Sequence, residues 1–352
     1  MQPFVVTRFV DSHVLALRGS SIAARLSDRE YDEVRTSTSA AAPLPVWFVS
    51  LVGSIWGIRS PKADQVLVRS NLFLGYARAS WEITEGCTYD CLHCYLSKKA
   101  DHALPWSSRT KVIECLVDAG VLILQITGGE PLADRYFVRT YSEVWDLGIL
   151  VTVSTNGARL SEKLFLDLFC TREPQRITVS MYGASSVTYD ALTRRPGSYL
   201  KFVRGVTAAS EAGLNVRLNI IVTRCSQHER KLMVSFAESR GLPYFVYDRL
   251  SPTIYGDSTP LAIQATDRRS SAQAFTGCDA GMTFFHIDQR GRASICKISR
   301  APSVDLVEGG VAVLESLRGF AKSSLDDRDV PSDLKGAVCA PQARLLSVGK
   351  MV

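Results

Sequence analysis

Three cysteines stand close together at Cys87, Cys91 and Cys94, and their spacing is the first sign of chemistry in this sequence. Thiolates this close together can hold one metal ion or one iron–sulfur cluster, because both bind soft sulfur ligands. A structural zinc site usually takes four protein ligands, and His93 is available as the fourth. The motif alone leaves both sites open and favours the cluster.

Three further cysteines lie near the far end of the chain, at Cys278, Cys296 and Cys339. A predicted β-hairpin over 283–296, with its turn at 289–292, would present Cys296 at its end. Cys115 and Cys170 fall among apolar residues of predicted helices, where we expect small core side chains.

A repeated unit in the middle of the chain must position these residues. A predicted amphipathic helix ends in glycine and an apolar, β-branched run follows, as at Gly120, Gly148, Gly213 and Gly241. With two further runs, the predicted strands are Trp81–Thr84, Val121–Thr127, Ile149–Ser154, Ile177–Ser180, Leu214–Val222 and Leu242–Tyr247. We interpret these nearly continuous apolar runs as parallel strands covered on both faces. Their number predicts a partial, open barrel, with function at the C-terminal ends of the strands.

Characteristic polar residues follow three of these strands. The second strand ends in Gly128-Gly129-Glu130, the third in Ser154-Thr155-Asn156, and the fourth in Ser180. Together with the three-cysteine loop after the first strand, this set resembles the radical S-adenosylmethionine (SAM) superfamily over residues 78–252. A plain turn is the alternative for 154–157, and the combined pattern favours the ligand interpretation.

The resemblance implies a four-iron cluster on Cys87, Cys91 and Cys94, with one iron open to chelation by SAM. It implies that the Gly128-Gly129 backbone approaches the methionyl ammonium and that Glu130 accepts a hydrogen bond from it. By family position, Ser154, Thr155, Asn156 and Ser180 would bind the carboxylate or the ribose of SAM. Arg194 is a looser candidate to pair with the carboxylate. His93 or Tyr95 would pack on the adenine. An electron donor such as flavodoxin or ferredoxin is implied as a partner.

The tail resembles the short auxiliary-cluster extension called SPASM or twitch. Cys278 and Cys296 would be ligands on the hairpin, and Cys339 would be the third. Gln342 stands where the family tends to have another cysteine, so the resemblance implies one auxiliary four-iron cluster. Its fourth site would be an open iron, a non-cysteine ligand or Cys225. A zinc ribbon that lacks one ligand is the alternative.

We therefore expect an α/β chain with three parts. Residues 1–76 would form a small α+β domain, residues 77–255 a partial (β/α)6 radical SAM barrel, and residues 256–352 a twitch-like iron–sulfur domain. The first part would either bind a leader peptide or cap the barrel without a ligand.

Two substrate classes remain open. The stretches 180–198 and 250–256 resemble enzymes that modify ribosomally made precursor peptides. The short tail also fits dehydrogenases and epimerases of small metabolites such as sugars, aminoglycosides or nucleosides. Asp248 and Arg249 are candidates for the final acid or base, with a salt bridge at the barrel rim as the alternative.

Composition excludes other classes. A net charge of +6 is spread along the chain without a basic run, so no nucleic-acid partner is expected. The longest apolar stretch, 44–58, is interrupted by polar residues, Pro45 and Gly53, and is too short to cross a bilayer. Without a signal peptide at its start, the sequence predicts a cytoplasmic protein whose cysteines are not structural disulfides.

Overall fold

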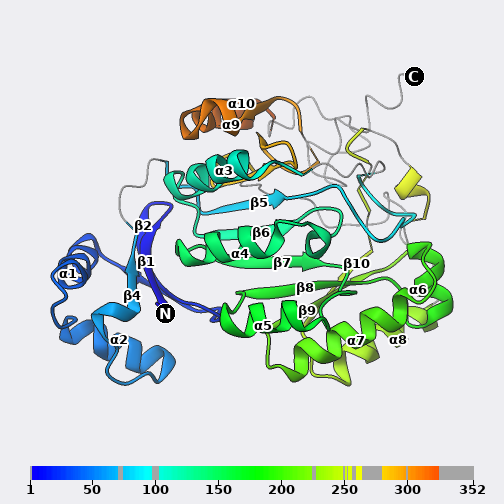
Figure 1. Ribbon diagram of the computed structural model, residues 1–352, viewed down its shortest axis with the longest axis horizontal. Coiled ribbons are helices and arrows are strands. Elements are labelled where there is room, and N and C mark those ends of the chain that lie inside the picture. The colour runs from blue at the N-terminus through cyan, green and yellow to red at the C-terminus, as the bar shows by residue number, and fades with distance from the viewer. Residues whose placement is uncertain are drawn as a thin grey trace.

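The computed structural model describes residues 2–69, 74–96, 103–223, 227–248, 250–251, 253–255, 259–263, 280–298 and 300–324. Within these residues, nine strands form one sheet in the order β10-β9-β8-β7-β6-β5-β11-β12-β13 (Figure 1). The strands are β5 (Arg78–Glu82), β6 (Ile123–Thr127), β7 (Leu150–Thr155), β8 (Arg176–Met181), β9 (Val216–Ile221), β10 (Tyr244–Tyr247), β11 (Phe284–Ile287), β12 (Arg292–Ser294) and β13 (Ser303–Asp305).

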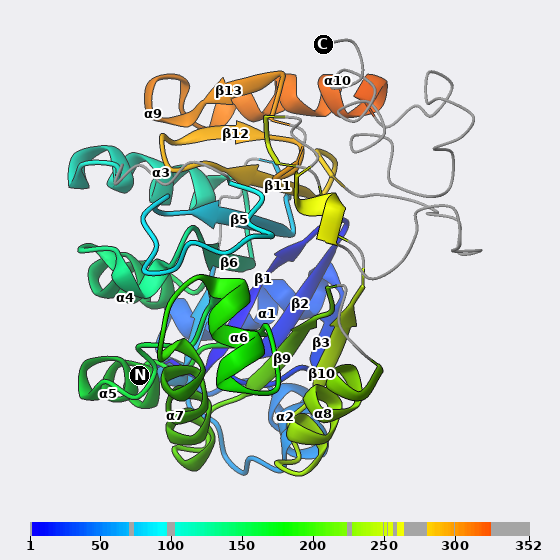
Figure 2. The same cartoon turned by 90° about the vertical axis from the view of Figure 1, so that its right-hand side faces the viewer.

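The strands from β5 to β10 run parallel, each to its neighbour, which confirms the expected parallel α/β architecture. Helices lie along one face of this curved sheet (Figure 2). They are α3 (Trp106–Asp118), α4 (Phe137–Asp146), α5 (Lys163–Thr171), α6 (Ser186–Thr193), α7 (Ser198–Glu211) and α8 (Gln227–Glu238). Side chains from the strands and these helices share one hydrophobic core. The glycines at 120, 148, 213 and 241 all have positive φ, so each reverses the chain as predicted.

The structure differs from the prediction in what covers the two faces of the parallel strands. In β9 buried residues alternate with partly exposed ones, and Arg217, Asn219 and Ile221 line the cavity described below. The sheet is thus covered by helices on one face and borders a cavity on the other. The expectation of strands covered on both faces was wrong, because the polar residues at alternate positions mark the inner face.

The N-terminal segment builds a second sheet in the order β3-β2-β1-β4. Its elements are β1 (Phe4–Phe9), β2 (Ser12–Leu17), β3 (Ala23–Leu26), β4 (Val66–Val68), α1 (Asp28–Ser39) and α2 (Val46–Trp56). Ser27 and Glu30 form a reciprocal capping box at the start of α1. Phe4, Val34 and Phe48 belong to a separate hydrophobic cluster of this segment.

The hairpin near the C-terminal end forms as expected, with β11 antiparallel to β12. The structure adds that β11 pairs in parallel with β5, from Phe284 beside Arg78 to Ile287 beside Trp81. The hairpin therefore extends the barrel sheet beyond its first strand. Further along lie α9 (Leu306–Gly309) and α10 (Leu314–Ser324). Among the described residues, no helix has both the length and the apolar character needed to cross a membrane.

Candidate active site

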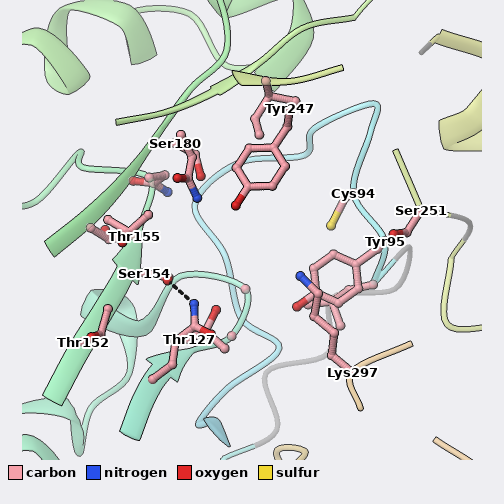
Figure 3. Close-up of a pocket in the computed structure, with 18 of the residues that line it drawn as sticks. Cys94, Tyr95, Thr127, Thr152, Ser154, Thr155, Ser180, Tyr247, Ser251 and Lys297 are labelled. Atoms are coloured by element: carbon pink, nitrogen blue, oxygen red, sulfur yellow. Dashed lines mark hydrogen bonds between the residues drawn. The ribbon is translucent and has the colours of Figure 1, made fainter. Parts of the chain in front are cut away.

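A cavity of about 830 Å³ lies on the inner face of the sheet (Figure 3). The thiols of Cys87, Cys91 and Cys94 line it. So do residues at the C-terminal ends of β6, β7 and β8, namely Thr127, Gly128, Gly129, Ser154, Thr155, Asn156 and Ser180. The structure thus brings together, at one edge of the parallel strands, nearly all of the residues that the sequence singled out.

The cysteine loop is fixed by its own backbone and by α6. Cys94 donates its N–H to the Cys91 carbonyl, and the Cys87 sulfur accepts the N–H of Tyr89 at 3.4 Å. The N–H groups of Asp90 and Leu92 donate to carbonyl oxygens at the C-terminal end of α6. These contacts hold the three thiols at the mouth of the barrel.

Tyr182 is buried close to all three cysteines. Burial raises its pKa well above the usual value, and the nearby Cys91, Cys87 and Cys94 raise it further. Among the described residues there is no group of three or more His, Cys, Asp or Glu side chains that could hold a metal ion.

The chain segment that leads into Cys87 leaves no room for a side chain at Gly128 or Gly129. A Cβ on Gly128 would lie 2.4 Å from the Thr84 carbonyl oxygen, and one on Gly129 would lie 2.3 Å from that of Glu85. The N–H of Gly129 donates to Thr84 and that of Glu130 to Gly86, at 2.8 Å each. The close approach that excludes side chains here is therefore made by the chain segment that leads into Cys87.

The expected contact between Glu130 and a methionyl ammonium is not the arrangement found. The Glu130 carboxylate is 1% exposed and does not line the cavity. It accepts hydrogen bonds from Thr155 Oγ1 at 2.6 Å, from the Asn156 N–H at 2.7 Å and from the Leu132 N–H at 3.1 Å. Burial raises the Glu130 pKa, and these hydrogen bonds oppose that rise. The carboxylate is occupied by donors of this chain.

Arg194 also lies elsewhere. It caps the C-terminal end of α6 in a left-handed conformation, at φ 53°. Its guanidinium contacts Asp90 at 3.2 Å on the surface, and it does not line the cavity. The expected pairing with a carboxylate in the cavity is therefore not supported by its position.

His93 and Tyr95 both line the cavity, as expected. The His93 ring lies 4.8 Å from that of Tyr182, centroid to centroid. Tyr95 donates its hydroxyl proton to Glu82 at 2.6 Å, so its ring is held in place from below the cysteine loop.

Sequence reasoning missed a buried charged network beneath this loop. The Glu82 side chain is fully buried, and it accepts from Arg300 at 2.8 Å and lies 3.6 Å from His286 Nε2. His286 Nδ1 in turn lies 2.8 Å from the Ser80 hydroxyl oxygen. The network joins β5 to the C-terminal segment. Its residues are far apart in the sequence, so no local motif predicts it.

Sequence reasoning also missed the cations of the cavity, which are Arg78, Arg176, Arg217 and Lys297. Figure 3 shows Lys297 beside Tyr95, with Tyr247 reaching in from β10. The alternation Arg176, Thr178, Ser180 along β8 was the available signal, because alternate residues of a strand share one face.

Four further residues that the sequence singled out are described, and five others are not. Cys296 follows β12, is partly buried and packs against the main core. Asp248 is described and does not line the cavity. Cys115 is buried as expected, whereas Cys170 is exposed on α5, against expectation. The predictions for Cys225, Arg249, Cys278, Cys339 and Gln342 lie outside the described residues.

Known proteins are similar in sequence to about half of this chain. An AdoMet-dependent heme synthase of Methanosarcina barkeri is 27% identical over 185 residues, covering 51% of this chain and 52% of that protein. The antilisterial bacteriocin subtilosin biosynthesis protein AlbA of Bacillus subtilis is 29% identical over 182 residues, covering 51% and 40%. The chain spans about half the length of the curated relatives it matches.

The fold is shared over almost the whole chain with a solved structure. Streptococcus suis SuiB bound to precursor peptide SuiA superposes with a TM-score of 0.66, covering 97% of this chain and 93% of that one at 14% identity. The family model of the radical SAM superfamily matches residues 81–233, from β5 into α8. Residues 81–233 therefore form a radical SAM domain.

Proposed function

We propose that this chain is a radical SAM enzyme that abstracts hydrogen from a ribosomally made precursor peptide during natural-product maturation. The observation that carries the first half is the convergence of Cys87, Cys91 and Cys94 on one cavity with the polar ends of β6, β7 and β8. Cys87, Cys91 and Cys94 would hold a four-iron cluster there, because such clusters are held by cysteine thiolates. When bound, the cluster supplies the electron that cleaves SAM reductively.

The chain's own residues would then hold SAM beside that cluster. The backbone of Gly128 and Gly129 and the side chains of Ser154, Asn156 and Ser180 border the same cavity as the thiols. They offer donors and acceptors to an amino acid group and a ribose. The rings of His93 and Tyr95 offer flat surfaces for adenine. Glu130 supports this edge from behind, through Thr155 and Asn156.

The peptide half of the proposal draws on two likenesses. The architecture matches SuiB, whose structure was solved with precursor peptide SuiA, from the N-terminal sheet through the hairpin. AlbA, a bacteriocin biosynthesis protein, is 29% identical over 182 residues. A cavity of about 830 Å³ open to solvent can accept an extended segment of chain. We further propose that the N-terminal sheet binds the leader of that peptide, and that the tail holds an auxiliary cluster.

A small-metabolite substrate is the second candidate. It is favoured by the likeness to a heme synthase, at 27% identity over 185 residues. Both candidate functions use the same cleavage of SAM. They differ in whether the molecule that is modified, and so changes mass, is a peptide or a small metabolite.

The proposal is tested with the full chain, loaded anaerobically with iron and sulfide and then reduced. With SAM present, 5′-deoxyadenosine should form, and a precursor peptide encoded beside this gene should change mass. Replacing Cys87, Cys91 and Cys94 by alanine should abolish both, because the cluster loses its ligands. The matched control is Cys170→Ala, whose thiol is exposed on α5 away from the cavity. Product formation at the wild-type rate in the triple variant would refute the assignment.

A further inference from the structure

Apart from the three cysteines, the described lining residues that carry a full charge are all cationic. Arg78, Arg176, Arg217 and Lys297 contribute cationic groups, and none of the described lining residues is an aspartate or glutamate. Like charges repel one another, and more strongly where they are partly buried than in bulk water. A cavity with these cationic side chains is suited to an anionic ligand.

Two of these cations lie on neighbouring strands, offset by two residues in the register. Arg176 begins β8, and Arg217 lies on β9, where it pairs in register with Thr178. Both line the cavity. The Nε atoms of both arginines are buried and have no hydrogen-bond partner. Arg217 makes one contact, from Nη2 to Asn219 Oδ1 at 3.3 Å, and neither arginine has an ion pair among the described residues.

Burial and mutual repulsion both disfavour this pair. Burial lowers the pKa of Arg176, and the positive charge of Arg217 lowers it further. Two partly buried guanidiniums without a counter-charge destabilise the fold unless an anion joins them.

The buried arginines that support this fold are arranged differently. Arg109 is fully buried and donates to Leu104, Thr140, Ile83 and Asp134, the last at 2.7 Å. Arg69 donates to the carbonyl oxygens of Val121 and Val117. Arg69 makes these two hydrogen bonds although its Nε, like those of Arg176 and Arg217, is buried without a partner. The two structural arginines thus each donate at least two side-chain hydrogen bonds, whereas among the described residues Arg217 donates one and Arg176 none.

We propose that Arg176 and Arg217 together bind an anionic oxygen group of the substrate, a carboxylate or a phosphate, inside the barrel. A guanidinium is suited to this, because its planar fork of donors matches both groups. The inference rests on the proposed function in one respect, that the substrate occupies this cavity.

The position of the pair separates this anion from the carboxylate of SAM. Arg176 precedes Ser180 by four residues along β8, which is about 13 Å at the rise of a strand. The pair therefore lies toward the N-terminal ends of the strands, whereas the thiols lie at the C-terminal edge.

Calorimetric titration of the cluster-loaded, SAM-bound full chain tests this proposal. The probes are N-acetyl-L-glutamate, its neutral analogue N-acetyl-L-glutamine, and inorganic phosphate. The wild-type chain should bind at least one anion and not the neutral amide. Arg176→Gln and Arg217→Gln should each weaken that binding by about ten- to a hundredfold, as expected for loss of a charged hydrogen bond. The matched control is Arg204→Gln, on the exposed side of α7.

Charge-preserving variants keep the test sharp if a glutamine variant fails to fold. Arg176→Lys and Arg217→Lys should retain more anion binding than the glutamine variants do. Preference for N-acetyl-L-glutamate would support an acidic peptide, and preference for phosphate a phosphorylated metabolite. Equal binding of the amide, or unchanged anion affinity in both glutamine variants, would overturn the proposal. Anion binding in a chain that makes no 5′-deoxyadenosine would instead contradict the proposed function and leave this site standing.

Discussion

Glu130 Oε2 accepts a hydrogen bond of 2.7 Å from the backbone N–H of Asn156. Oε1 of the same carboxylate accepts the Thr155 hydroxyl at 2.6 Å, so one buried side chain ties the end of β6 to the end of β7. Asn156 and Thr155 border the cavity, whereas Glu130 does not. Glu130 is therefore a positioning residue in this structure, and we infer that its effect on SAM passes through the β7 edge.

Glu130→Gln should destabilise the chain even when SAM and the cluster are absent. The amide places N–H groups where one carboxylate oxygen accepts hydrogen bonds, so a buried backbone donor loses its acceptor. The free energy of unfolding should fall by about 1–3 kcal/mol, measured by chemical denaturation. The matched control is Glu162→Gln, which breaks an exposed pair with Arg159 and should change stability by less than about 1 kcal/mol. If Glu130 instead served SAM directly, its replacement would leave the stability of the empty chain unchanged.

Glycine after a helix, followed by an apolar run, predicted four of the six parallel strands, and apolar runs alone predicted the other two. These signals could be used because they are local in sequence. The pairing of β11 with β5 was not predictable in this way. It joins Phe284 to Arg78, which are far apart in the chain, and their contact depends on how the tail returns to the sheet. The hairpin itself was predicted, because its turn and its strands are adjacent.

The candidate site shows the same division. Spacing placed Cys87, Cys91 and Cys94 at the C-terminal edge, because parallel strands bring all such loops together. The direction of a side chain was not contained in a motif, so Glu130 was expected in the cavity and lies behind it. The arginines of β8 and β9 were overlooked because these strands were interpreted as apolar throughout.

Gly129→Ala should release the cysteine loop from β6. The added Cβ would lie 2.3 Å from the Glu85 carbonyl oxygen and 2.4 Å from that of Gly86, and backbone atoms cannot move aside without moving the segment that leads to Cys87. We expect lower iron content after reconstitution and lower thermal stability. The matched control is Gly319→Ala in α10, where a Cβ meets nothing within 4 Å. That change should be neutral or stabilising by up to about 1 kcal/mol. Wild-type iron content in Gly129→Ala would contradict the packing argument.

Glu82 should give the chain an acid-sensitive term in its stability. Burial alone would raise its pKa, but His286 and Arg300 outweigh burial and lower it from 4.5 to about 2. Burial lowers the pKa of His286, so Arg300 is the charge that faces Glu82 at neutral pH. Because the folded pKa is the lower one, this stabilisation is present above pH 4.5 and is lost as the pH falls toward 2.

Denaturation of the cluster-free chain at stepped pH measures that term. Between pH 4.5 and about 2 the wild-type free energy of unfolding should fall more steeply than that of Glu82→Gln, which has no carboxylate to protonate. The neutral variant should also be less stable near pH 7, since Arg300 then remains buried without its partner. If the free energy of unfolding fell equally in the two chains over this pH range, the pKa of Glu82 would not be lowered in the folded state.

The tail should hold a second iron–sulfur cluster on Cys278, Cys296 and Cys339. Cys296 lies at the end of the hairpin whose first strand pairs with β5, so a cluster there would stand beside the barrel. Iron analysis of the reconstituted chain should give about eight irons, and replacement of the three cysteines by alanine should leave about four, as for two four-iron clusters. Cys170→Ala, whose thiol is exposed on α5, should keep the full count. About four irons in the wild-type chain, together with zinc that disappears in the triple variant, would replace the second cluster with a zinc site. The first cluster would stand in either case, because its ligands lie on a separate loop.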